Sequence, residues 1–144
     1  MMAKKRRHWF LNVLIIAAVL CSIFAFVVHS KNWTRLQGDR MQILSGLYYQ
    51  EVPFGELDSV LWKERIPQME RSHGFSFWAR EKGVFVDSLY PERPVYVYVD
   101  DLRQHKIKVR YRDTMVLFLN FADSLETRTM YQFLKNELEL RSQQ

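Results

Sequence analysis

The chain opens with a long apolar segment. Residues 9–28 carry no charged side chain, and only Asn12 and Ser22 among them are clearly polar. A helix of about 20 residues spans the roughly 30 Å hydrocarbon core of a bilayer and satisfies its own backbone groups there. Trp9 stands at one end, where an amphipathic ring suits the membrane interface. This segment is therefore predicted to be a single transmembrane helix.

The charges that flank the apolar segment predict its orientation. Residues 4–7 read Lys-Lys-Arg-Arg, whereas Lys31 and Arg35 follow the segment at looser spacing. The positive-inside rule then places residues 1–8 in the cytoplasm as a basic tip and the remainder of the chain on the far side of the membrane. A cleaved signal peptide is the alternative. The apolar stretch is longer than the roughly 7 to 15 residues of a signal-peptide core, which favours the membrane anchor.

After the apolar segment, the pattern changes to short runs of alternating side chains. Residues 29–40 are polar without a clear period and are interpreted as a linker. Alternation of period two, with Val, Tyr and Phe enriched, then predicts strands. Hairpin or chain-reversing turns are expected at Glu81–Gly83 and at Pro91–Pro94. The predicted strands are Met41–Leu47, Tyr48–Val52, Ser59–Glu64, His73–Ala79, Val84–Leu89, Val95–Val99, Lys106–Arg112 and Met115–Asn120.

The pattern changes again near the C-terminus. Residues 123–140 contain neither Gly nor Pro, and Asp123 with Glu126 resembles a helix capping box. Apolar residues recur at three- and four-residue spacing, which predicts one amphipathic helix. These apolar residues are Leu125, Met130, Phe133, Leu134 and Leu138. Seven or eight strands followed by one helix predict a mainly β domain over residues 41–142, a small barrel or sandwich capped by the helix.

Several short blocks in this order are similar to the bacterial pleckstrin-homology-like domain family. The blocks are residues 46–48 (GLY), 52–57 (VPFGEL), 66–67 (IP), 71–75 (RSHGF), 83–85 (GVF) and 120–123 (NFAD), with Thr127, Tyr131 and Leu134. The resemblance implies a seven-stranded barrel capped by the C-terminal helix, and a binding or scaffolding role rather than catalysis. Eukaryotic relatives bind phosphoinositides through a basic loop between the first strands, whereas residues 47–50 here contain no Lys or Arg.

Charge and composition narrow the function classes. The net charge is +5, but without residues 4–7 the remaining 17 basic residues face 16 acidic ones. The chain outside the tip therefore gives no electrostatic reason to expect nucleic-acid binding. A single cysteine excludes an intrachain disulfide framework. We find no nucleophile elbow, phosphate-binding loop, dinucleotide fingerprint or zinc-protease motif, and the four histidines show no ligand spacing. We expect neither an enzyme, a metal site nor a cofactor.

Four cations alternate along one predicted strand. Lys106, Lys108, Arg110 and Arg112 would share one face, about 6.6 Å apart. Aligned cations create a positive potential that can hold lipid headgroups or an acidic partner. The alternative is an ordinary solvated strand face that discourages edge pairing. The intervening residues, which would face the core, are Ile107, Val109 and Tyr111.

Three further features have a functional and a structural interpretation. Arg71 and His73 next to Gly74 form a second candidate binding site, or else Gly74 serves a bulge and Arg71 pairs with a nearby acid. The adjacent carboxylates Asp100 and Asp101 are interpreted as a solvated turn with a local cap. The aromatic residues of the domain are expected in the core, with an aromatic-lined groove as the alternative. They are Trp62, Phe75, Phe77, Trp78 and Phe85.

Together these patterns predict a single-pass membrane protein that holds a binding module at the membrane surface. The expected partner is a protein of an envelope complex or anionic lipid headgroups. The alternative is a small-ligand-binding accessory protein involved in sensing or assembly.

Overall fold

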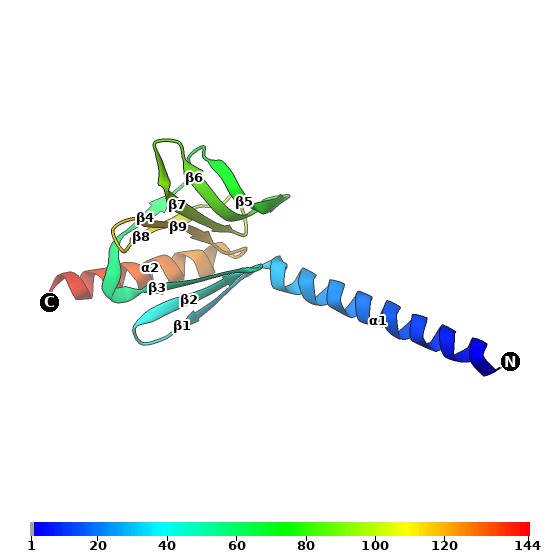
Figure 1. Ribbon diagram of the computed structural model, residues 1–144. Coiled ribbons are helices and arrows are strands. Elements are labelled where there is room, and N and C mark those ends of the chain that lie inside the picture. Colours follow the sequence, from blue (N-terminus) through cyan, green and yellow to red (C-terminus); the bar gives the residue numbers. More distant parts are fainter. Residues whose placement is uncertain (1) are drawn as a thin grey trace.

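The computed structural model describes residues 2–144, with side chains from residue 8 onward, so the predicted tip at residues 1–8 lies almost entirely outside the described side chains. Within that range the chain forms two α-helices, nine strands and one 3-10 helix (Figure 1). In chain order these are α1 (Met2–Ser30), β1 (Asn32–Leu36), β2 (Arg40–Ser45), β3 (Tyr48–Pro53), η1 (Phe54–Glu56), β4 (Leu57–Lys63), β5 (Glu70–Phe77), β6 (Arg80–Asp87), β7 (Tyr90–Val99), β8 (Lys106–Tyr111), β9 (Met115–Asn120) and α2 (Ser124–Ser142). A mainly β fold with an apolar N-terminal helix and a C-terminal helix is thus confirmed.

Helix α1 extends away from the β-structure as a single rod (Figure 1). Within its stretch His8–Ser30, the most apolar window of 18 residues has a mean hydropathy of 2.8, and none of that window is buried against the rest of the protein. These 23 residues rise about 35 Å, which exceeds the roughly 30 Å hydrocarbon core. Among the described residues, α1 is the one helix long and apolar enough to cross a membrane, although a signal sequence satisfies the same two criteria.

The strands of the described chain form two sheets. The smaller sheet has the order β1-β2-β3 and is antiparallel throughout. The larger has the order β4-β8-β9-β7-β6-β5, and its β7 and β9 run parallel while its other neighbours are antiparallel. The described residues therefore hold nine strands, against the seven or eight that the pattern predicts and the seven that the resemblance implies.

The main hydrophobic core lies between the two sheets and under α2. Met41, Ile43 and Val52 from the small sheet face Ile107, Val109 and other apolar residues of the large one, and all five side chains are fully buried. A second cluster lies on the opposite face of the large sheet, where Phe85, Val95, Val97, Val99 and Phe118 pack together. The central strands β7 and β9 are thus buried on both faces.

Helix α2 begins where the sequence predicts, but fewer of its apolar residues are buried than the predicted stripe contains. The Asp123 carboxylate accepts a hydrogen bond from the Leu125 backbone at 2.9 Å, which confirms the predicted N-cap. Met130 and Leu134 are buried against the sheets, whereas Leu125 is exposed. The hydroxyl of Thr127 accepts from the Phe121 backbone at 3.0 Å and so fixes the chain entering the helix.

Two expectations about local structure were wrong. Residues 29–40 are not a linker, because they contain the end of α1 and all of β1, which pairs with β2. The chain also does not turn at Glu81–Gly83 or Pro91–Pro94. The hairpin turns lie at Trp78–Ala79 and Ser88–Leu89, and the expected turn residues are strand residues of β6 and β7.

Gly83 explains why a turn was wrongly expected at Glu81–Gly83. It faces Gly74 across the β5–β6 pair, and a Cβ on Gly83 would lie 2.1 Å from the His73 carbonyl oxygen. Both glycines have positive φ, at 139° and 157°. These glycines therefore permit close approach of two strands rather than a chain reversal. The turn itself uses Trp78 at φ 53°, a conformation that the sequence does not signal.

Candidate functional site

The chain leaving α1 enters the β-structure through a buried polar junction. A single residue, Lys31, separates the last residue of α1 from the first residue of β1, Asn32. The Asn32 side chain is buried and donates to the carbonyl oxygens of Tyr98 at 2.6 Å and Asn120 at 2.8 Å. Its amide oxygen accepts from the Ser45 hydroxyl. One side chain thus joins the end of α1 to β2 of the small sheet and to β7 and β9 of the large one.

An ion pair lies next to Asn32. The Nζ of Lys82 is 3.0 Å from a carboxylate oxygen of Asp100, and both side chains are almost completely buried. The other Asp100 oxygen accepts from the Asn32 backbone at 2.8 Å, while Lys82 also donates to the His29 carbonyl at 3.4 Å. Burial lowers the pKa of Lys82, and the nearby Asp100 carboxylate opposes that effect. Both charges therefore contact the junction between helix and domain.

Asn120 completes the junction from the large sheet. Its amide oxygen accepts from the backbones of Asp100 at 2.8 Å and Asp101 at 3.1 Å, and its amide nitrogen donates back to the Asp101 carbonyl at 2.7 Å. Asp101 caps its own turn, because it accepts from the Arg103 backbone and side chain. The local cap expected at this turn is confirmed at Asp101, but the expectation of a solvated turn was wrong, because Asp100 and Asp101 are both buried. We call Asn32, Ser45, Lys82, Asp100 and Asn120 the polar junction.

A groove lies beside this junction, between α1 and the β5–β6 hairpin. Its volume is about 460 Å³. Ala25, Phe26, His29 and Ser30 of α1 line one side, and the hairpin lines the other. The rings of His29 and Phe75 are in contact, with centroids 5.4 Å apart. The hairpin residues that line the groove are Phe75, Ser76, Phe77 and Arg80.

Two exposed apolar turns lie next to this groove. Phe77 and Trp78 stack on each other at the end of the β5–β6 hairpin, with ring centroids 5.3 Å apart and Trp78 88% exposed. Leu47, in the β2–β3 turn, is 83% exposed. The preceding Gly46 lies against the His29 ring, since a Cβ on it would be 2.9 Å from that ring. The expectation that Phe77 and Trp78 belong to the core was therefore wrong, while Phe85 is in the core.

The structure does not bring the four predicted cations together as one solvated face. The alternation along β8 is confirmed, because Ile107, Val109 and Tyr111 face the main core. Lys106, however, is only 1% exposed, and its ammonium donates to the carbonyls of Glu64 at 2.9 Å and of Leu102. Burial lowers the pKa of Lys106. The chain around Glu64 and Leu102 covers this position, so Lys106 has a structural role.

The other three cations differ in their surroundings. Lys108 is partly buried, with its ammonium 5.7 Å from the Phe118 ring centre, and Arg110 is exposed. Arg112 lies beyond the end of β8, in the turn at φ 50°, and forms an ion pair with Glu56. The backbone thus turns Arg112 out of the row, and an acid from η1 neutralises it.

Arg71 and His73 lie on β5, the edge strand of the large sheet, and both are exposed. Arg71 donates to the Ser76 hydroxyl at 2.8 Å rather than pairing with an acid. A register irregularity separates Arg71 from His73, and it accompanies the close glycine pair at Gly74. The irregularity of β5 thus lies between Arg71 and His73, while Gly74 itself pairs with Gly83 in the strand ladder.

Sequence reasoning missed the polar junction. The hydrogen bonds that join Asn32 to the large sheet connect residues 66 to 88 positions apart, and no local pattern encodes that separation. Over the described residues, no three His, Cys, Asp or Glu side chains lie together as a possible metal site. Comparisons with protein-family models, curated proteins and solved structures found no match.

Proposed function

We propose that this chain is a single-pass membrane protein whose α1 crosses the bilayer and whose β-structure is a binding module held at the membrane surface in a fixed orientation. The N-terminus lies in the cytoplasm in this proposal, because residues 4–7 are all basic. The module then lies on the opposite side of the membrane.

The observation that carries the proposal is the short, buried connection between α1 and the sheets. Only Lys31 separates them, and one residue reaches at most about 3.6 Å. The next residue, Asn32, is fixed by the polar junction to both sheets. A tether with free linker would need no such junction. This arrangement instead ties the end of α1 to a strand of the small sheet and to two central strands of the large one.

The pleckstrin-homology-like character of the module stays part of the proposal. Two packed sheets with a C-terminal helix over the core support it. A protein partner in an envelope complex, or lipid headgroups, would bind to the surface that the fixed orientation presents. The cations Lys108 and Arg110 and the edge residues Arg71 and His73 remain candidate contact positions, since each is at least partly exposed.

An alkaline wash of isolated membranes tests the anchor. We expect the full-length chain to stay in the membrane pellet, at unchanged mass. Release into the supernatant, or a shortened chain, would contradict the anchor and favour a cleaved signal sequence.

Cysteine accessibility tests the orientation. Replacement of the single Cys21 by Ser allows one new cysteine at exposed Ser88, in the β6–β7 turn. Intact cells should label Ser88→Cys with an impermeant maleimide, and should not label Ala3→Cys in the basic tip. Reversal of the two results would refute the proposed orientation while leaving the anchor in place.

A further inference from the structure

We propose that the turn of the β5–β6 hairpin, with Phe77 and Trp78 at its end, inserts into the interfacial layer of the bilayer that α1 crosses. The module would then contact lipid at a second point, separate from its anchor. This inference rests on the proposed membrane span of α1.

The level of the hairpin along α1 carries the argument. Phe77 lines the same groove as Ala25 and Phe26, which belong to the uncharged segment ending at Val28. Ala25 precedes Val28 by three residues, or about 4.5 Å along the helix. If α1 spans the bilayer, the edge of the hydrocarbon core lies near Val28. The hairpin end therefore reaches the level of the last apolar turn rather than staying above the membrane.

The residues at the hairpin end are typical of the membrane–water interface. Trp is enriched at membrane–water interfaces, where its ring lies among the headgroups. Trp78 also adopts the left-handed conformation, at φ 53°, in a turn position that favours glycine. The Trp78 ring stacks on Phe77, but both rings are exposed, so this contact does not bury Trp78 in water. Contact with lipid supplies a physical reason for its presence.

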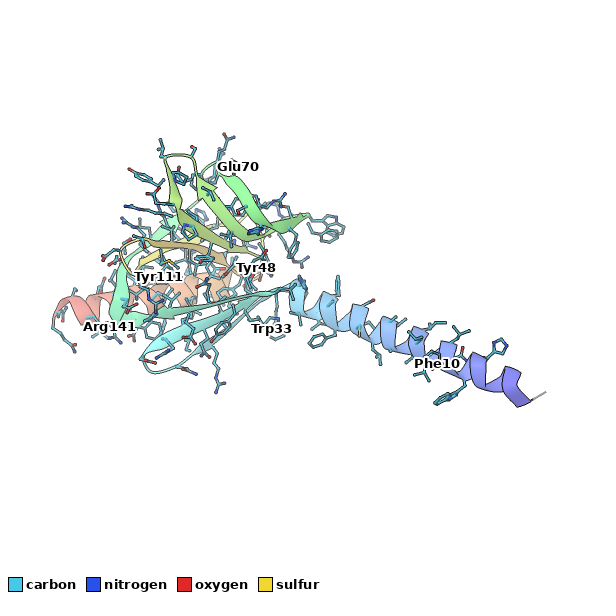
Figure 2. All side chains as sticks on the ribbon, in the orientation of Figure 1. Phe10, Trp33, Tyr48, Glu70, Tyr111 and Arg141 are labelled. Atoms are coloured by element: carbon cyan, nitrogen blue, oxygen red, sulfur yellow. The ribbon has the colours of Figure 1, made fainter. Side chains whose placement is uncertain are left out.

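A neighbouring turn lies at a similar level. Gly46 lies against the ring of His29, so Leu47 projects from the same end of the protein as α1. Trp33 is at this end too, beside the junction of α1 with the small sheet (Figure 2), and the ammonium of Lys31 is 4.1 Å from its ring centre. Exposed apolar residues thus lie on several sides of the exit of α1, where a bilayer would cover them.

Arg80 supplies a polar contact at the same place. It lines the groove beside Ser30, and among the described residues it takes part in no ion pair. Its side chain is partly exposed, although its Nε is itself buried. A phospholipid phosphate at the interface is an acceptor of the right charge for a guanidinium.

The opposite end of the same strand provides a matched control. Leu89, in the β6–β7 turn, is 79% exposed, which is comparable to Trp78. The two turns lie at opposite ends of β6, whose eight residues extend about 26 Å. Only the β5–β6 turn lies beside α1, so a bilayer would contact Trp78 and not Leu89.

The test uses the full chain in vesicles of phosphatidylcholine and phosphatidylglycerol, with one environment-sensitive fluorophore per sample. The fluorophore is attached to the native Cys21, or to Trp78→Cys or Leu89→Cys in a Cys21→Ser background. Because both new positions are exposed, substitution there removes no core contact. The readouts are the emission wavelength and quenching by a nitroxide-labelled lipid.

We expect a shift to shorter wavelength and quenching by lipid at positions 21 and 78, and neither effect at position 89. Lipid quenching at 21 with a water-like signal at 78 would overturn insertion of the hairpin while leaving the anchor intact. A water-like signal at 21 would overturn the anchor and, with it, this inference. Equal quenching at 78 and 89 would also overturn it, because it would indicate general adsorption of the module to lipid.

Discussion

Replacing Asn32 with Ala tests whether the polar junction fixes the module to α1. The change removes three side-chain hydrogen bonds, to Tyr98, Asn120 and Ser45. A typical intramolecular hydrogen bond contributes about 1 kcal/mol, so the three together give a loss of about 3 kcal/mol in the free energy of unfolding. The backbone contact of residue 32 with Asp100 is retained, which makes this figure a measure of the side chain alone.

Urea unfolding of the full chain in mild detergent, followed by tryptophan fluorescence, measures this loss. Asn136→Ala is a matched control, because the same substitution at an exposed position of α2 removes none of the junction contacts. A second readout is the distance distribution between spin labels at Cys21 and at position 89, which should broaden in the Asn32→Ala protein. A variant that unfolds within about 0.5 kcal/mol of the parent, with an unchanged distribution, would refute the proposed role of the junction.

Three other changes have definite expected outcomes. Gly83→Ala should lower the free energy of unfolding by more than about 1 kcal/mol, because its Cβ would meet the backbone at 2.1 Å, whereas Gly38→Ala, with nothing within 4 Å, should be tolerated in the same thermal unfolding assay. Hydrogen bonds from Arg103 lower the pKa of Asp101 from 3.8 to about 2. The stabilisation of the folded state by the ionised Asp101 carboxylate is therefore complete above about pH 4 and is lost as the pH falls toward 2. The Asp101→Asn substitution should flatten that part of a curve of unfolding free energy against pH. Lys106→Glu should cost more than about 3 kcal/mol in urea unfolding, since it places a carboxylate against two carbonyl oxygens; an unfolding midpoint equal to that of the parent would contradict the buried position.

The elements with a local repeat could be predicted from the sequence. The apolar span is recognised from its length and lack of charge, eight of the strands and α2 are recognised from the pattern within a short window, and each has a counterpart in the structure. Strand β1 has no such period, because its inward positions are Asn32 and Thr34 while Trp33 and Leu36 are exposed. A strand whose buried side chain is polar resembles a linker when its hydrogen-bond partners are unknown.

The site depended on features that local patterns do not contain. Alternation placed Lys106 correctly on the face of β8 opposite the main core. Whether that face is solvated depends on the chain near Glu64 and Leu102, which is distant in sequence. Lys82 was likewise assigned to a turn because of the neighbouring Gly83, although it is a buried partner of Asp100. Burial by segments that are distant in sequence, rather than residue type, determined the role of both lysines.

The absence of slack between α1 and β1 has a mechanical consequence. Transmembrane helices tilt by about 20° on average, and the tilt changes with the thickness of the surrounding bilayer. A domain on a flexible linker would keep its orientation when the helix tilt changes, but here Lys31 is the only residue between α1 and β1. If α1 crosses the bilayer as proposed, a change in its tilt would therefore also change the orientation of the large sheet, to which Asn32 is hydrogen-bonded. The thickness of the lipid bilayer would then set the direction in which the membrane-distal face of the protein points.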